Sequence, residues 1–539
     1  MKNHFTLGSE WRVWDLQVQT ILDDRYISLS EYYEDLKSTD PDKWNEYISM
    51  VGGEENAIKF DSRVYFNDES ESREAISTNY VRNMFAFISV YSANVGCIGI
   101  TDHNYWDNSL LDTFASYSKF SKIKVVCGVE VNVAGVHILV FFKTPPFNQL
   151  TFSEGIKVFL NNIKVYNQKS DGVLTVCTLG IEQVLSTIRK HKGIYIFPHC
   201  NSNNGLFQER GKTDRTYLGS VFNTRKRILL QGNSKDSIDK TKGYILTNPN
   251  NLFKAKAIFT TSPDSRCLKE IWKADSNGNY CWIKSNPGFI GLEQIVYEPE
   301  LRVFIGSNPP SKIERSKIIK SITVSNSNGW FPEPLRIGFN ESQVCLIGGK
   351  GSGKTALLDI VAYAANSFDF NEISFLSRST KNKSSNLIAG TNITLEWDDG
   401  TVDKTTIPSQ LSRKTELDLV NSKLLYLSQN YVERLCSFDQ IEELNNQIEA
   451  VIFQKVPREE KSGYNGFQSY KESRIETISK EKQRYKKEVI TANSEIAFYR
   501  TYISREEETL LQKKNKIDDL NQLLKEYEVA SNTGNPKKS

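Results

Sequence analysis

Short apolar runs alternate with amphipathic segments along roughly the first three hundred residues. The runs at 95–101, 124–133, 136–142 and 192–199 are rich in β-branched and aromatic residues, as expected for buried strands. The segments between them carry the spacing of helices that bury one face. This alternation predicts an α/β fold. An acidic stretch at about 27–74, rich in Tyr and Ser, interrupts it, and we interpret that stretch as a surface insertion.

A second pattern begins near residue 319. Strands are predicted at 321–325, 335–339 and 344–347, and the last leads through a glycine-rich loop into a helix at 356–365. The stretch 392–407 predicts a hairpin that turns at Asp399 and Gly400, because Asp-Gly tolerates the backbone angles of a tight turn. Residues 423–435 predict a further strand that runs into a helix.

The third pattern is a heptad repeat. Apolar residues recur in steps of three and four from Ile475 to Tyr527, and thirteen of the sixteen repeat positions are apolar. The exceptions are Lys482, Glu506 and Lys513. A seam sustained over about seven heptads predicts a coiled-coil arm, and at 1.5 Å per residue it spans roughly 80 Å.

Length and composition fit these three patterns. A chain of 539 residues exceeds one ordinary core. We divide it into an α/β domain at 8–310, a lobe at 315–450, the arm at 468–529 and a tail at 530–539. The net charge of +3 is too small to indicate a polyanionic partner, and the eight cysteines form no CxxC pair. With no apolar span and no signal-peptide core, we expect a cytoplasmic protein with no membrane association.

The glycine-rich loop satisfies GxxxxGK[ST], the pattern of a phosphate-binding P-loop. Its residues are Gly348, Gly349, Lys350, Gly351, Ser352, Gly353, Lys354 and Thr355. Glycines let successive backbone N–H groups converge on phosphates, and the following helix directs its positive end at them. We expect ATP here, with Lys354 reaching the β and γ phosphates and Thr355 giving an oxygen to Mg²⁺.

Metal-ligand residues stand where the apolar strands of the first domain end. They are Asp102, His103, Glu130, His137, His199 and Asp264. Strand ends converge at one face of a barrel, and imidazole and carboxylate there indicate a metal site. We expect these residues, Asp102 aside, to hold at most one Zn²⁺ or Mn²⁺ ion.

Two resemblances extend these predictions. The segment IGGKGSGKTALLD resembles the P-loop of SMC/Rad50-like ATPases of the AAA/ABC class, and LLYLSQNYVE resembles their Q-loop, which implies a role for Gln429 in sensing Mg²⁺ and the γ phosphate. Most of 8–306 resembles the PHP family of metal-dependent phosphoesterases, which implies a distorted (β/α)7 barrel. The likeness is closest to TrlF-like and Ppl-like proteins, in which a PHP domain is fused to an SMC-like ATPase and serves in anti-phage defence.

The chain departs from both families. Gln17 and Gln19 stand where the PHP pattern has HxH, and Arg266 stands where it has the His of DxH. Glutamine ligates weakly and arginine not at all, so we expect a degenerate site. After residue 529 no Walker B stretch or LSGGQ-like signature follows, so we expect the catalytic acid of an ATPase from a partner chain or a further C-terminal half.

The leading hypothesis is therefore an ATP-binding, SMC-like ATPase that controls a degenerate PHP domain, in anti-phage defence or nucleic-acid surveillance. One alternative is a non-hydrolysing ATP sensor or scaffold within a larger complex. A second is an active metal-dependent PHP nuclease or phosphoesterase. ATP held between heads and a coiled coil favour a homo-oligomer. The basic runs 224–227 and 378–383 are the candidate contacts for DNA or RNA.

Overall fold

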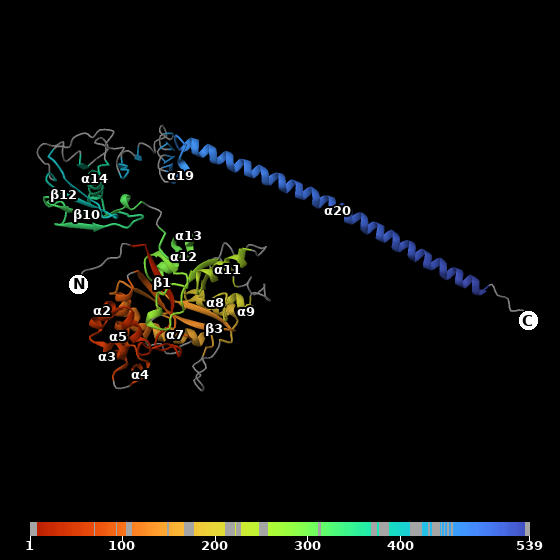
Figure 1. The fold of residues 1–539 in the computed structure, drawn as a ribbon, viewed down its shortest axis with the longest axis horizontal. Coiled ribbons are helices and arrows are strands. Elements are labelled where there is room, and N and C mark those ends of the chain that lie inside the picture. Colours follow the sequence, from red (N-terminus) through yellow and green to blue (C-terminus); the bar gives the residue numbers. More distant parts are fainter. Residues whose placement is uncertain are drawn as a thin grey trace, which may run out of the picture. The chain divides into compact units, whose positions relative to one another are not determined.

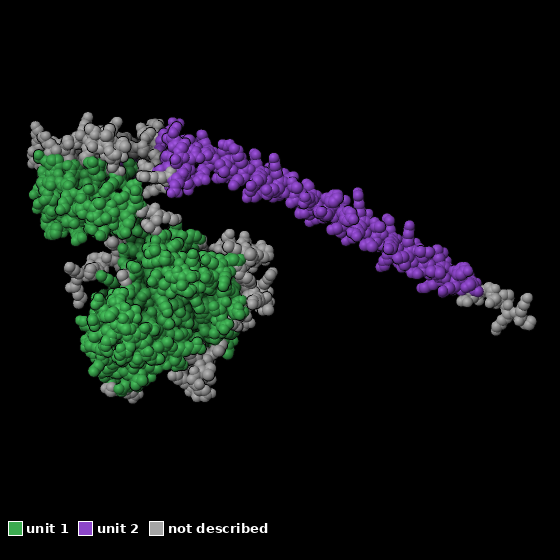
Figure 2. Space-filling model, in the orientation of Figure 1, with its two compact units in different colours: residues 1–370, 375–425 green, residues 371–374, 426–539 purple. Residues whose placement is uncertain are grey.

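The computed structural model describes residues 8–533 with interruptions. Those left out are 69–70, 93, 104–109, 148–149, 166–176, 211–220, 222–227, 247–256, 311–313, 368–374, 377–387, 410–422, 430–431, 434–441, 443–444, 447, 450–451 and 454–455. Both basic runs proposed as nucleic-acid contacts lie outside the described residues. The chain forms two compact units, one of residues 1–370 and 375–425 and one of residues 371–374 and 426–539 (Figure 2).

A nine-stranded sheet organises the first three hundred residues (Figure 1). Its strands are β1 (Glu10–Val18), β2 (Val95–Ile100), β3 (Lys124–Val133), β4 (Val136–Phe141), β5 (Ile194–Phe197), β6 (Ile228–Gly232), β7 (Ala257–Thr261), β8 (Tyr280–Ser285) and β9 (Val303–Gly306). Their order in the sheet is β7-β6-β5-β4-β3-β2-β1-β8-β9. The expectation of an α/β fold is confirmed.

The sheet curls into a nearly closed barrel. A parallel bridge joins Val18, at the end of β1, to Ser265, which follows β7 at the far edge. Two backbone hydrogen bonds support this closure, from Gln19 N to Ser265 O at 2.8 Å and from Ser265 N to Gln17 O at 2.9 Å. Pairing is parallel between β1, β2 and β3 and between β5, β6 and β7, whereas β4 runs antiparallel to β3 and β5.

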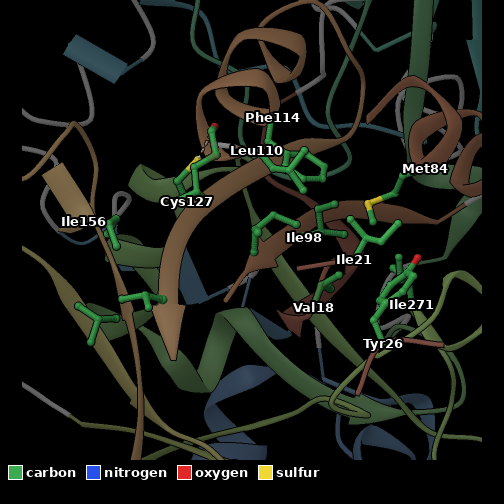
Figure 3. Packing of buried hydrophobic residues seen from close by; sticks show 14 of the residues in the cluster. Val18, Ile21, Tyr26, Met84, Ile98, Leu110, Phe114, Cys127, Ile156 and Ile271 are labelled. Carbon is green, nitrogen blue, oxygen red and sulfur yellow. Dashed lines mark hydrogen bonds between the residues drawn. The ribbon is translucent and has the colours of Figure 1, made fainter. Parts of the chain in front are cut away.

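Helices cover the barrel strands. They are α5 (Arg73–Tyr91), α6 (Leu110–Ser118), α7 (Phe152–Asn162), α8 (Ile181–Lys190), α9 (Leu206–Arg210), α11 (Lys235–Leu246), α12 (Phe289–Tyr297) and α13 (Pro299–Arg302), with the short η2 (Leu268–Glu270). Local sequence sets their starts, since Thr151 and Glu154 form a capping box at α7. Ile98 of β2, Cys127 of β3 and Phe114 of α6 belong to the main core cluster (Figure 3).

The interrupting segment is more than a surface insertion. It folds into η1 (Leu29–Glu31), α1 (Tyr33–Thr39), α2 (Pro41–Val51), α3 (Glu54–Phe60) and α4 (Arg63–Phe66). Trp44 and Tyr47 of α2 are fully buried in the main core, and the Tyr47 hydroxyl donates to Asn83 on α5. These aromatic residues recur at helical spacing and pack against α5, so the segment extends the core.

A second, four-stranded sheet follows η3 (Arg315–Lys317). It contains β10 (Ile319–Ser325), β11 (Leu335–Gly338), β12 (Asn392–Trp397) and β13 (Val402–Thr406), in the order β11-β10-β12-β13, with α14 (Lys354–Ala364) beside β12 and β13. The predicted hairpin is confirmed, and Gly400 takes the left-handed conformation of its turn, with φ +87°.

Two predicted strands are wrong. Residues 344–347 and 423–427 form no ladder with any described strand. A strand exists only through its hydrogen-bonded neighbours, and both segments instead expose apolar side chains, with Ile347 94% exposed and Leu425 54% exposed.

The heptad region is one continuous helix, α20 (Phe467–Thr533), preceded by the short α19 (Arg458–Lys461). The predicted helix is confirmed, while its pairing in a coiled coil stays a prediction. No helix among the described residues is long and apolar enough to cross a membrane.

Candidate functional site

Strand ends deliver polar side chains to one end of the barrel. Gln17 and Gln19 lie at the end of β1, His103 follows β2, and Glu130 lies near the end of β3. Because β4 is antiparallel to β3, its second residue, His137, pairs with Asn132 and so lies at the same end. His199 follows β5 and Asp264 follows β7, both with positive φ, which indicates that the surrounding structure holds them in place.

Three of the predicted ligands form a compact cluster. The ligand atoms of His103, Glu130 and His137 all lie within 4.8 Å of one another. His137 Nδ1 lies 2.6 Å from Glu130 Oε1, and the His103 and His137 ring centroids are 4.6 Å apart. The His199 ring is next in line, with its centroid 5.1 Å from that of His137. The structure thus brings four of the predicted residues together, three histidines and the fully buried Glu130.

The two glutamines bind the same carboxylate. Gln17 and Gln19 donate from Nε2 to Glu130 Oε2 at 3.0 and 2.9 Å. Gln231 of β6 in turn donates from Nε2 to Gln17 Oε1 at 2.8 Å. A further metal ion would need ligand lone pairs at these positions. The amide hydrogens of Gln17 and Gln19 occupy them instead. Sequence reasoning missed Gln231, although a single polar residue within the apolar stretch ILLQG was a usable signal.

Asp102 and Asp264, the two remaining acids, hydrogen-bond to neighbouring residues. Asp102 accepts hydrogen bonds from Thr20 N at 2.6 Å and Thr20 Oγ1 at 2.8 Å, so it fixes the loop after β1. Asp264 Oδ2 accepts from Arg266 Nη2 at 3.1 Å, and Arg266 Nη1 donates to Asp23 at 2.9 Å. Asp264 Oδ1 and Gln19 Oε1 are buried oxygens with no hydrogen-bond partner among the residues that the structure describes. Such oxygens can accept from a donor brought by a ligand.

The electrostatics of the site favour a cation. Burial alone would raise the pKa of Glu130, but the His137 hydrogen bond and the charges of the neighbouring imidazoles lower it to about 2. Burial lowers the pKa of His199 to about 4 and also lowers that of His103. Near neutral pH the site therefore holds the ionised carboxylate of Glu130 beside the neutral imidazoles of His103 and His199, the protonation states in which these groups ligate metals.

The donor set fits one divalent ion and does not fit a multinuclear cluster. Imidazole nitrogens and a carboxylate suit Zn²⁺, Mn²⁺ or Fe²⁺. Gln17 and Gln19 use their amide hydrogens on Glu130, and Arg266 stays protonated and is held by two carboxylates.

The glycine-rich loop at 348–355 forms a turn around its own lysine. Lys354 Nζ donates to Gly348 O at 2.8 Å and to Gly349 O at 2.7 Å, and α14 begins at this residue. Gly351 and Gly353 have φ of +82° and +86°, angles that favour glycine. A Cβ on Gly348 would lie 2.5 Å from Ser352 Oγ, so a side chain there would require the Ser352 hydroxyl to rotate away. Gln429 belongs to the second unit, where its Nε2 donates to Glu433 at 2.8 Å.

Comparisons with known proteins place the chain in no family. No family model matches it, and no curated protein sequence matches it. Among solved structures, it is similar to a protein from Bifidobacterium adolescentis provisionally described as a metal-dependent phosphoesterase, with 9% sequence identity. That match covers 53% of this chain and 96% of the other, with a TM-score of 0.27. At that TM-score the similarity establishes neither the fold nor the function of this chain.

Proposed function

We propose that the barrel binds one divalent transition-metal ion and hydrolyses a phosphate ester. The observation that carries this proposal is the cluster of His103, Glu130 and His137, whose ligand atoms lie within 4.8 Å of one another. His199 offers a further imidazole beside it. This proposal differs from the leading hypothesis of the sequence analysis, in which the barrel is a degenerate PHP domain.

The residues around the cluster have roles that suit hydrolysis. A bound divalent ion would polarise a phosphoryl oxygen and lower the pKa of water. Burial, followed by the nearby charge of Glu130, raises the pKa of Asp264 to about 6, so this carboxyl can take up and release a proton near neutral pH. Arg266 contacts Asp264 and Asp23 on either side and thereby orients the Asp264 carboxylate.

Hydrolysis of bis(p-nitrophenyl) phosphate, measured with the full chain in Zn²⁺ or Mn²⁺, tests the proposal. We expect turnover that chelation abolishes and that Glu130→Gln lowers by about a hundredfold or more, because loss of the central carboxylate removes the ion. Lys354→Ala is the matched control, since it changes the P-loop and leaves the cluster intact. A wild-type protein that holds metal but shows no turnover on phosphodiester or phosphomonoester would contradict the proposal.

A second proposal concerns the P-loop, which we propose binds Mg²⁺–ATP. The loop conformation supports it: glycines occupy the positions of positive φ, and the lysine amine lies against the loop carbonyls where phosphate oxygens would compete for it. The exposed Val344 and Ile347 beside the loop could be covered by an added strand.

Titration with a fluorescent ATP analogue tests nucleotide binding. Lys354→Ala should weaken it about a hundredfold, since Lys354 would contact the β and γ phosphates. Lys350→Ala removes the same charge from the same loop and should have a much smaller effect. Equal losses of affinity in the two variants would contradict the proposal, because they would show that the loop attracts the analogue only through nonspecific charge.

A further inference from the structure

The helix α20 presents a long apolar seam without a covering surface among the described residues. Val489, Ile496, Ile503 and Leu510 are 58%, 49%, 53% and 59% exposed. Single exposed apolar side chains are ordinary, but a row maintained at heptad spacing along one helix is the pattern of a helix that pairs. An isolated helix of this kind gains its stability from a partner.

The polar positions of the seam distinguish between possible arrangements. Lys482 stands at an a position, and Glu506 and Lys513 stand at d positions of the same repeat. In a parallel, in-register pair of identical helices, each charge would face the same charge. In an antiparallel pair, a positions face d positions, so one register sets Lys482 opposite Glu506. Glu506 is the only acid among the sixteen seam positions, so no other a–d register neutralises Lys482.

We propose that α20 is a self-association surface, on which the α20 of a second copy lies antiparallel with Lys482 opposite Glu506 of that copy. The two-fold axis then passes at residue 494, midway between these positions. By symmetry the charge pair forms twice. The seam layers become Lys482–Glu506, Val489–Tyr499, Ile496–Ala492, Ile503–Tyr485, Leu510–Ile478 and Ile475–Lys513.

This register is physically consistent in two further ways. The small Ala492 faces the branched Ile496 next to the axis, which avoids a clash of two large side chains. The helices overlap from residue 467 to residue 521, about 80 Å at 1.5 Å per residue, which is ample for a stable pair. Lys513 meets Ile475 near the end of the overlap, where its amine can reach solvent.

A charge-exchange series measured by analytical ultracentrifugation tests the register. Lys482→Glu places like charges against each other in both symmetric layers, so we expect the dimer Kd to rise about tenfold or more. Glu506→Lys should do the same, and the double variant Lys482→Glu, Glu506→Lys should restore the wild-type Kd. Lys480→Glu is the matched control, because Lys480 lies on the outward face, where it pairs with Glu476 at 2.6 Å.

Site-directed cross-linking tests the orientation independently. Asn493 lies beside the axis and faces Asn493 of the second copy, so Asn493→Cys should cross-link with a short bismaleimide. Val489→Cys should not, because the two copies of residue 489 would be separated by about 15 Å along the axis. Peptide mass spectrometry in a Cys345→Ser background identifies the linked residues. Any one of three results would overturn the proposal. They are cross-linking through Val489→Cys, a wild-type chain that is monomeric at every concentration, and a double charge variant whose dimer Kd does not return to the wild-type value.

Discussion

At the scale of residues, Glu130 determines what the barrel site can bind. It is fully buried, and it accepts hydrogen bonds from Gln17, Gln19 and His137. The two glutamine amides direct N–H hydrogens at the Glu130 carboxylate, at positions that additional metal ions would otherwise occupy. These donors keep the central carboxylate ionised, and the proposal assigns the site one ion at most.

Replacing both glutamines should change the metal content. The double variant Gln17→His, Gln19→His replaces amide donors by imidazole lone pairs, so we expect the bound metal to rise from about one toward about two ions per chain. Inductively coupled plasma mass spectrometry after dialysis measures this ratio. Gln522→His adds an imidazole to the exposed α20 and should leave the ratio unchanged. An unchanged ratio in the double variant would show that Arg266 or the pocket shape, and not the glutamines, limits the site.

Asp61 makes stability depend on pH. This carboxyl is completely buried, accepts from Leu29 N at 2.9 Å, and has its pKa raised by burial from 3.8 to about 8. The folded state binds the proton more tightly than the unfolded state. Its contribution to stability is thus complete below about pH 4 and is lost as the pH rises to about 8.

The melting temperatures of the wild type and Asp61→Asn, compared from about pH 5 to about pH 9, measure this contribution. The amide cannot ionise, so the difference should shift in favour of the variant up to about pH 8 and then level off. If the melting temperatures of the two proteins differ by the same amount at every pH, Asp61 does not titrate in this range.

The site residues illustrate what sequence can and cannot predict. The strand-end positions of His103, Glu130 and His199 followed from apolar runs and their polar ends, since parallel strands end together. His137 lies at the same end for a different reason, because β4 begins there and runs antiparallel to β3. The hydrogen bonds of Asp102 to Thr20 were not predictable, because they depend on the loop that follows β1. Nor was it predictable that the glutamine amides would donate to Glu130, since this depends on side-chain orientation.

At the scale of elements, the packing of β3 against β4 holds the cluster together. These strands carry Glu130 and His137, and Gly128 of β3 pairs with Phe141 of β4. A Cβ on Gly128 would lie 2.3 Å from Val140 O. The close approach of the two backbones thus requires glycine at this position.

Gly128→Ala should lower the free energy of unfolding by about 1–3 kcal/mol, because the backbone of β4 must shift. It should also weaken metal binding, since the same shift separates Glu130 from His137. Gly243→Ala in α11 has nothing within 4 Å of its added Cβ and should be neutral or slightly stabilising. Thermal unfolding with and without Zn²⁺ compares the two. Equal stabilities would show that β3 and β4 can separate without cost.

The elements also show why some sequence predictions were wrong. The segment 344–347 has the composition of a strand, yet it has no neighbour to complete a ladder, and Ile347 remains 94% exposed. Composition indicates that a segment can be a strand, while pairing depends on another segment. The helices α1 to α4 were missed for the converse reason, since their buried aromatic residues are interspersed with acids that suggested a surface stretch.

At the scale of the whole molecule, the chain combines a barrel with a buried cluster, a four-stranded sheet with a glycine-rich loop, and a long helix. Nucleotide turnover, nucleic-acid contacts and a role in anti-phage defence stay predictions. The barrel proposal and the P-loop proposal depend on separate residues, so each can fail without the other.

The most direct test of the central claim is the metal content of the full chain by native mass spectrometry after equilibration with Zn²⁺ or Mn²⁺. We predict about one tightly bound ion per wild-type chain, its loss in Glu130→Gln, and its retention in Lys354→Ala. A wild-type protein that binds no ion, or a Glu130→Gln protein that binds as much metal as the wild type, would contradict the assignment of His103, Glu130 and His137 as a metal centre.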